Sequence, residues 1–260
     1  MEVEQLKYWL AFSRIRGIGR VRFKLLEGYF ESMEAAWSAS EAELRAAGLD
    51  RRTIRSVVDG RLSVEPDAEL ERLLNSGIQA HTWHDEEYPA RLKEIYDLPP
   101  LIYVKGSLLP DDERSVAVVG TRNPTHYGRQ VTEQLVRDIA NAGVTIVSGL
   151  ARGVDGVAHQ IALDAGQRTI AVLGSGLDII YPREHTSLSE RVAENGALVS
   201  EHALGTRPDA RNFPRRNRIM SGMTLGTLVV EAGARSGALI TARQALEENR
   251  EVFAVPGSIY

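Results

Sequence analysis

Glycine, serine and arginine recur directly after short apolar runs in the second half of the chain. These stretches read Gly-Thr-Arg-Asn at 120–123, Ser-Gly-Leu-Ala-Arg-Gly at 148–153, Gly-Ser-Gly at 174–176 and Glu-Ala-Gly-Ala-Arg-Ser-Gly at 231–237. Glycine lets the backbone approach a ligand closely, serine offers a hydroxyl, and arginine binds phosphate oxygens in a bidentate manner. The composition is typical of a rim that binds phosphate groups, although glycines after strands also serve ordinary tight turns into helices.

Arginine is also concentrated between residues 207 and 218, where five arginines stand against one aspartate in a chain of net charge −4. Because nucleic acid is bound chiefly by neutralising phosphates, an acidic chain must do this through a local patch. The segment 212–220 predicts a helix start whose first turn carries arginines, the wrong sign of charge for the helix dipole. We expect these arginines to bind a ligand, with a solvated charged turn or internal ion pairs as the alternative. Phe213 fits either stacking on a base or packing into the core.

The apolar runs before these stretches predict the strands of a parallel sheet. Six runs alternate with segments of helical period, at 116–119, 144–147, 169–173, 197–199, 228–230 and 252–255. Continuous apolar runs mark strands that are buried on both faces. The pattern predicts a doubly wound α/β fold, an extended Rossmann-like parallel sheet, with one further strand at 101–104. Ligands bind outside the carboxyl ends of such strands, so the glycine and arginine stretches should meet at one edge.

The first sixty residues predict a small all-α domain. Apolar residues at helical spacing precede and follow the turn Gly17-Ile18-Gly19. This turn resembles a helix-hairpin-helix, or a SAM-like helical domain, whose backbone N–H groups can meet a DNA phosphate; a tight turn without a ligand fits equally well. The predicted domains are an N-terminal helical domain at 1–65, a connector packed on the Rossmann domain at 66–110, and a Rossmann-like DNA-binding domain at 111–260.

Several other classes of function lack their signatures. The chain has no cysteine and only six scattered histidines, so we expect no disulfide and no metal site.

Motifs of nucleotide-dependent and hydrolytic enzymes are also missing. The chain has neither a phosphate-binding loop of the ATPase type nor a complete dinucleotide fingerprint. Ser148 is not in a serine-hydrolase motif, and we expect Asp155 to orient its neighbours rather than act as a base. We predict no catalytic residue, no cofactor and no enzymatic activity. The lack of a signal peptide and of an apolar span of about 18 residues predicts a cytoplasmic protein with no membrane partner.

The order of these motifs resembles that of the DNA-processing protein A (DprA/Smf) family. The matching segments are Val119–Arg122, Ser148–Asp155, Ala171–Asp178, Phe213–Ile219 and Ser236–Ala242, and Pro89–Gly106 resembles the segment that precedes the family's Rossmann domain. The resemblance implies a domain that binds single-stranded DNA without sequence specificity in a basic pocket. It further implies a homodimer that hands the strand to the RecA recombinase as a recombination mediator during natural transformation.

The residues that we predict to bind DNA lie at the strand ends and in the arginine-rich helix start. They are Gly120, Thr121, Arg122, Ser148, Gly149, Arg152, Gly153, Gly174, Phe213, Arg215, Arg216, Asn217, Arg218, Ser236 and Gly237. The resemblance implies phosphate contacts for Arg122 and for the arginines of 213–218. Thr121 stands where the family usually has serine, which keeps the hydroxyl. Family members usually continue beyond the point where this sequence ends, so we expect a truncated chain.

Two other functions remain open on the sequence. A nucleotide-binding enzyme of the phosphoribohydrolase type also has glycine-rich strand ends, but it carries a Pro-Gly-Gly-x-Gly-Thr loop where this chain reads Glu-Ala-Gly-Ala-Arg-Ser-Gly at 231–237. A protein-interaction scaffold would leave the arginine cluster dispensable for DNA retention. Charge reversal in that cluster separates the scaffold from a DNA-binding protein.

Overall fold

The computed structural model describes residues 3–257 and divides them into two compact units. The first unit reaches to Asp85 and includes Pro99–Ile102, and the second comprises Glu86–Leu98 and the chain from Tyr103 on. The domain boundaries predicted after residues 65 and 110 stay predictions.

The first unit is mainly helical, as the sequence predicts. Its elements are α1 (Val3–Arg14), α2 (Arg20–Tyr29), α3 (Met33–Ser38), α4 (Glu41–Ala46), α5 (Arg51–Arg61), α6 (Pro66–Leu74) and β1 (Gln79–Thr82). Its core is aromatic: Trp9 stacks on Phe23 with 5.0 Å between ring centroids, and Phe12 meets Trp37 edge to face at 5.0 Å. Gly17, with φ of +93°, lies in the turn that follows α1. The likeness of this turn to a DNA-binding hairpin stays a prediction.

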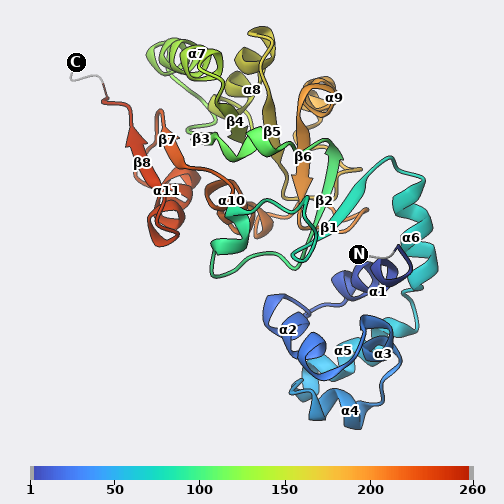
Figure 1. Ribbon diagram of the computed structural model, residues 1–260. Coiled ribbons are helices and arrows are strands. Elements are labelled where there is room, and N and C mark those ends of the chain that lie inside the picture. Colours follow the sequence, from blue (N-terminus) through green and yellow to red (C-terminus); the bar gives the residue numbers. More distant parts are fainter. Residues whose placement is uncertain (1–2, 258–260) are drawn as a thin grey trace. The chain divides into compact units, whose positions relative to one another are not determined.

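The second unit alternates strands and helices around a sheet (Figure 1). Its elements are η1 (Arg91–Glu94), β2 (Leu101–Gly106, from Tyr103 on), η2 (Pro110–Glu113), β3 (Ser115–Val119), α7 (His126–Asn141), β4 (Thr145–Ser148), α8 (Val154–Asp164), β5 (Thr169–Val172), η3 (Arg183–His185), α9 (Thr186–Asn195), β6 (Ala197–Ser200), α10 (Asn212–Gly222), β7 (Gly226–Val229), α11 (Gly237–Glu247) and β8 (Glu251–Ala254). Most of these strands consist of β-branched and other apolar residues, which suit a buried sheet.

The strand order confirms the predicted doubly wound α/β fold. Within residues 3–257 the sheet has the order β1-β2-β6-β5-β4-β3-β7-β8. The strands from β6 to β8 pair in parallel, and β2 pairs antiparallel with β6. The chain moves from β3 outward to β6 in one direction and then returns to place β7 on the other side of β3. This reversal creates a crevice at the carboxyl ends of β3 and β7, where open α/β sheets bind their ligands.

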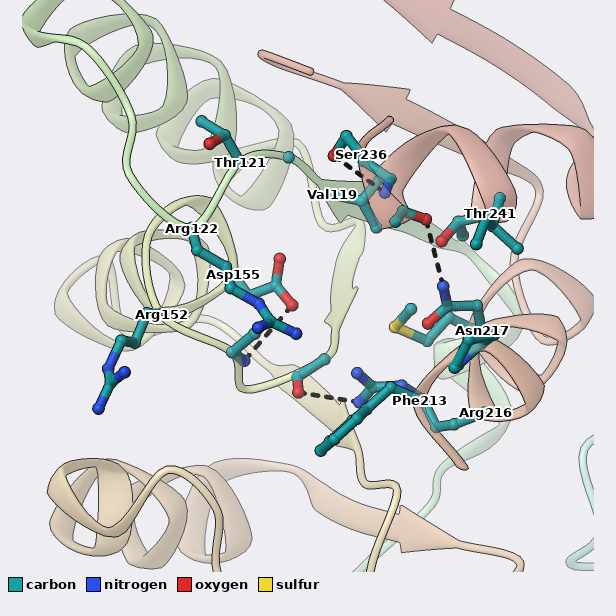
Figure 2. A pocket seen from close by; sticks show the side chains of 18 of the residues that line it. Val119, Thr121, Arg122, Arg152, Asp155, Phe213, Arg216, Asn217, Ser236 and Thr241 are labelled. Carbon is teal, nitrogen blue, oxygen red and sulfur yellow. Dashed lines mark hydrogen bonds between the residues drawn. The ribbon is translucent and has the colours of Figure 1, made fainter. Parts of the chain in front are cut away.

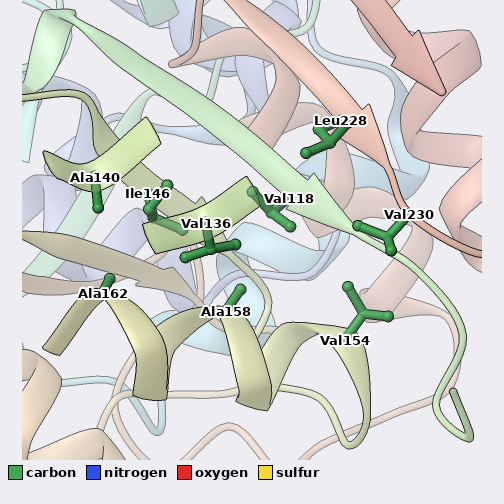
Figure 3. Close-up of a cluster of buried hydrophobic side chains, with 9 residues drawn as sticks. All are labelled: Val118, Val136, Ala140, Ile146, Val154, Ala158, Ala162, Leu228 and Val230. Carbon is green, nitrogen blue, oxygen red and sulfur yellow. The ribbon is translucent and has the colours of Figure 1, made fainter. Parts of the chain in front are cut away.

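Helices cover both faces of the sheet. On one face, α7 and α8 pack against β3 and β4, while α10 and α11 contact β5, β7 and β8 (Figure 1). The core on the α7 and α8 side joins Val118 of β3, Ile146 of β4 and Val136 of α7 to a row of small residues on α8 (Figure 3). That row includes Ala158 and Ala162, both fully buried. Small side chains allow α8 to lie close to the sheet, which brings the start of this helix to the crevice.

Candidate nucleic-acid interface

A pocket of about 1070 Å³ lies at the carboxyl ends of β3, β4 and β7. One wall comes from the loops after β3 and β4, and the other comes from α10 and the residues 233–241 at the start of α11. In Figure 2, Arg122 and Arg216 point toward the middle of the pocket from opposite sides, whereas Arg152 turns outward. The pocket occupies the crevice at which the order of the strands reverses.

Ten of the fifteen residues predicted to bind DNA line this pocket. These ten are Gly120, Thr121, Arg122, Gly149, Arg152, Phe213, Arg216, Asn217, Ser236 and Gly237. The remaining five, which lie outside the lining, are Ser148, Gly153, Gly174, Arg215 and Arg218. Ser148 is buried and donates its hydroxyl to the Val118 carbonyl, and Gly174 accepts a hydrogen bond from the side chain of Asn212. A role in DNA binding stays a prediction for all fifteen.

The loop after β3 is held on both sides by backbone hydrogen bonds. The Thr121 N–H donates to the Glu231 carbonyl at 2.7 Å, and the Thr121 carbonyl accepts from the Val154 N–H at 3.2 Å. Gly153 allows this crossing, because a Cβ atom at that position would lie 2.3 Å from the Thr121 oxygen. Arg122 is exposed at the tip of the loop, and no residue in the described range forms an ion pair with it. Its guanidinium is therefore available to an anionic ligand.

The loop after β4 forms the floor of the pocket. The Gly149 carbonyl accepts a hydrogen bond of 2.8 Å from Arg216 Nη1, and the Ala151 N–H donates to Asp155 Oδ2 at 3.4 Å. A Cβ atom at position 149 would lie 2.5 Å from Arg216 Nη2 and 2.7 Å from Asp155 Oδ2. Glycine is thus required where the backbone passes between a buried guanidinium and a buried carboxylate. Asp155 accepts a hydrogen bond from this loop, and its role as an orienting residue stays a prediction.

The arginines at the start of α10 have three different environments. Arg215 is exposed to solvent, and Arg216 is buried at the floor of the pocket. Arg218 is also buried, and it forms ion pairs with Asp97 at 3.0 Å and with Glu201 at 2.7 Å. The three environments that the sequence left open, a pocket-facing position, a solvated position and an internal ion pair, therefore all occur within one turn of helix.

The lining is strongly basic although the chain is acidic. It includes four arginines, at 122, 152, 216 and 235, and a single carboxylate, Asp155. Burial lowers the pKa of Arg216 to about 10, so this side chain remains charged at neutral pH. Burial raises the pKa of Asp155, and the nearby charge of Arg216 opposes that change. The pocket thus offers a preformed positive field to an anion.

Several lining residues were not predicted as site residues. Tyr181 lies in the long segment between β5 and α9, and its ring centroid is 5.7 Å from that of Phe213. Met220, Ile240 and Thr241 come from the inner sides of α10 and α11. The argument from strand ends does not find such residues, because a loop or helix that returns from elsewhere brings them to the pocket. The one available sequence signal for Tyr181 was the pair Tyr181-Pro182.

The arrangement can bind a chain of phosphates and pack against flat apolar groups. Arginine side chains suit phosphate oxygens, and the pair Tyr181 and Phe213 suits a base or sugar. In residues 3–257 we find no group of three or more His, Cys, Asp or Glu side chains that could hold a metal ion. No helix within the described range is both long and apolar enough to cross a bilayer.

Comparison with known proteins gives a consistent result. The family model described as DNA recombination-mediator protein A matches residues 79–260. Protein Smf of Synechocystis sp. is 41% identical over 256 residues, which cover 96% of this chain and 64% of that protein. DNA processing protein DprA of Bacillus subtilis is 47% identical over 185 residues, which cover 71% of this chain and 62% of that protein. The chain therefore spans somewhat less than two thirds of the length of these relatives.

Solved structures agree in fold. The structure of DNA processing protein A from Streptococcus pneumoniae superimposes with a TM-score of 0.84 and 34% identity, covering 97% of this chain and 87% of that chain. A structure that describes the single-stranded DNA binding mode of DNA processing protein A from Helicobacter pylori gives a TM-score of 0.64 and 33% identity, covering 70% of this chain and 82% of that chain. With a family model that matches well over half of the sequence, the chain belongs to the family of the DNA recombination-mediator protein A.

Proposed function

We propose that this protein binds single-stranded DNA, without sequence specificity, in the basic pocket at the ends of β3, β4 and β7. The observation that carries the proposal is the lining of four arginines and one aspartate in a chain of net charge −4. Phosphates are the common feature of all DNA sequences, and their neutralisation supplies most of non-specific affinity. The side chain of Arg122, which is exposed and faces the pocket, is the proposed first contact.

Membership of the family supports the proposal. A relative from Helicobacter pylori, 33% identical, has a described single-stranded DNA binding mode. From the family resemblance we further propose that the protein acts in the cytoplasm as a homodimer, and that it loads RecA recombinase onto the bound strand during natural transformation. The proposed role is that of a mediator without enzymatic activity. These steps depend on DNA binding, so DNA binding is the part to test first.

The test measures fluorescence anisotropy of a labelled oligo-dT with the wild-type chain and with the variant Arg122→Ala at several salt concentrations. We expect the variant to bind at least about tenfold more weakly, because a charge-assisted phosphate contact is worth about 1.4 kcal/mol or more. Loss of one phosphate contact should also reduce the slope of log K against log salt by about 0.7.

The matched control is Arg137→Ala, which removes one exposed arginine from α7 outside the pocket lining. It changes net charge by the same amount and should leave both the affinity and the salt slope unchanged. Equal effects of the two variants would mean that the DNA is held by net charge and not by the pocket. If the wild type fails to bind oligo-dT, hydrolysis of nucleoside 5′-monophosphates is the activity to assay, since the phosphoribohydrolase alternative would use the same pocket.

A further inference from the structure

Leu150 lies in the loop after β4, between two residues that line the pocket, Gly149 and Ala151, and has an unusual backbone conformation. Its φ is +55°, and its side chain is completely buried. Residues other than glycine, asparagine and aspartate seldom adopt this left-handed region, and they do so where the surrounding structure imposes it. Within residues 3–257 the only other non-glycine residue with a positive φ is Asn249, whose side chain type tolerates it. Some feature of the fold must therefore hold Leu150 in place.

Two histidine rings hold the polar backbone groups of Leu150. The Leu150 N–H donates to His159 Nε2 at 3.3 Å, and the Leu150 carbonyl accepts from His185 Nδ1 at 2.9 Å. His159 comes from α8 and is completely buried, whereas His185 ends η3 and is half-buried. The backbone at Leu150 is thus fixed from two separate elements.

The hydrogen bonds of His159 define its tautomer. Since Nε2 accepts from Leu150, the ring proton must be on Nδ1, which lies 2.7 Å from Thr169 Oγ1. The Thr169 hydroxyl in turn donates to the Ile146 carbonyl at 2.8 Å. Burial, together with the charges of His185 and Arg216, lowers the pKa of His159 to about 3, which keeps the ring neutral. A directed chain of hydrogen bonds therefore leads from β4 and β5 to the loop.

The turn at Leu150 sets the direction of the groups on either side of it. Gly149 precedes the turn and presents its carbonyl to Arg216 at 2.8 Å. Ala151 follows it and presents its N–H to Asp155. Both partners line the pocket. If Leu150 relaxed to a right-handed conformation, its two neighbouring peptide groups would rotate and the guanidinium of Arg216 would lose its anchor.

We propose that His159 is a positioning residue for DNA binding, which holds the Gly149–Arg152 segment in its binding conformation without itself touching the ligand. The proposal rests on the proposed function, because it assumes that the pocket binds the strand. His159 itself is buried and does not line the pocket, so its effect on binding would be indirect.

The experiment compares His159→Leu with His159→Gln in the full chain, using oligo-dT anisotropy and thermal unfolding. Leucine removes the acceptor for the Leu150 N–H, whereas the glutamine amide oxygen can replace it. We expect His159→Leu to weaken binding about tenfold, the effect of one lost buried hydrogen bond, and His159→Gln to retain most of the affinity. The matched control is Thr145→Val, which removes a buried hydrogen bond to Asp112 at the opposite end of β4. It should lower the melting temperature without changing affinity.

A double variant tests the route of the effect. If His159 acts through Gly149 and Arg216, its loss should matter much less once Arg216→Ala has removed the anchored side chain. Full additivity, or wild-type affinity in folded His159→Leu, would overturn the proposal.

Two DNA-free measurements separate this proposal from the proposed function. Long-range proton–nitrogen NMR should show the Nδ1–H tautomer of His159. Hydrogen exchange at the Leu150 amide should be faster in His159→Leu, which loses the bond, and close to the wild-type rate in His159→Gln. If the wild-type protein does not bind oligo-dT, the proposed function is wrong. The Nε2–H tautomer or unchanged exchange in folded His159→Leu would show that His159 does not hold the loop.

Discussion

Three arginines within positions 215–218 show how much the surroundings of a residue decide its role. Arg216 lies under the pocket and Arg215 lies in solvent, but Arg218 is directed to two carboxylates, Asp97 and Glu201. Asp97 is 121 positions away in the sequence. The sequence predicted an arginine cluster at the site, and ten of the predicted residues do line the pocket. It could not assign Arg218, because the partners of a buried side chain are brought together only by the fold.

Loss of Arg218 should therefore damage stability more than DNA binding. In Arg218→Ala the partly buried carboxylate of Glu201 loses its counter-ion, and we expect the free energy of unfolding to fall by about 3 kcal/mol. Urea unfolding followed by circular dichroism measures this change. Arg215→Ala is the control, and because its side chain is exposed it should alter stability by no more than about 0.5 kcal/mol. A stable Arg218→Ala protein with lost DNA affinity would instead place Arg218 in direct contact with the strand.

At the scale of the elements, the site depends on the crossing of two loops. The loop after β3 carries Thr121 and Arg122, and the loop that starts α8 passes directly beneath it at Gly153. The short apolar runs and the glycines that follow them were enough to predict the strands and the edge at which the loops meet. The contact between the loops was beyond prediction, because it depends on how closely α8 approaches the sheet over its alanine row.

The variant Gly153→Ala tests this crossing. Gly153 has φ of +76°, and a Cβ atom would lie 2.3 Å from the Thr121 carbonyl and 2.6 Å from that of Arg122. We expect a loss of stability of more than about 1 kcal/mol, the usual cost of alanine at positive φ, together with weaker oligo-dT binding as Arg122 is displaced.

Gly143→Ala is the matched control for that variant. Gly143 has nearly the same φ, +74°, but a Cβ atom there meets nothing within 4 Å. It should show the cost of backbone strain alone, with unchanged affinity in anisotropy measurements. If both alanine variants bind oligo-dT like the wild type, the crossing is not needed for the site.

At the scale of the whole molecule, charge is distributed unevenly. The chain has net charge −4, yet its pocket is lined by four arginines and one aspartate. An acidic remainder disfavours binding to DNA outside the pocket, because phosphates are repelled there. The sequence alone indicated that any basic patch must be local. Only the fold shows that Arg235 and Asp155 line the same pocket.

The fold also shifts the pKa of carboxylates outside the pocket, and Glu248 at the end of α11 is the clearest case. Burial raises the pKa of Glu248 to about 7, although the Ser221 hydroxyl and the charges of Arg250 and Arg218 oppose this. Between the unfolded value near 4.5 and the folded value near 7, the folded protein binds the proton more tightly than the unfolded chain. The stabilising contribution of this group is therefore complete below about pH 4.5 and is lost as the pH rises through 7.

The substitution Glu248→Gln should remove this pH dependence. Since Glu248 is partly exposed, solvent screening reduces the effect, and we expect the variant to be more stable than the wild type at pH 8 by about 1 kcal/mol at most, with the difference vanishing near pH 5. Urea unfolding at both pH values measures it, with Glu194→Gln, an exposed carboxylate on α9, as the control. A variant that is equally less stable at pH 5 and pH 8 would mean that Glu248 stabilises the fold by hydrogen bonds that glutamine cannot replace. In that case the charges of Arg250 and Arg218 stabilise the ionised carboxylate, and burial is not the dominant influence on the pKa of Glu248.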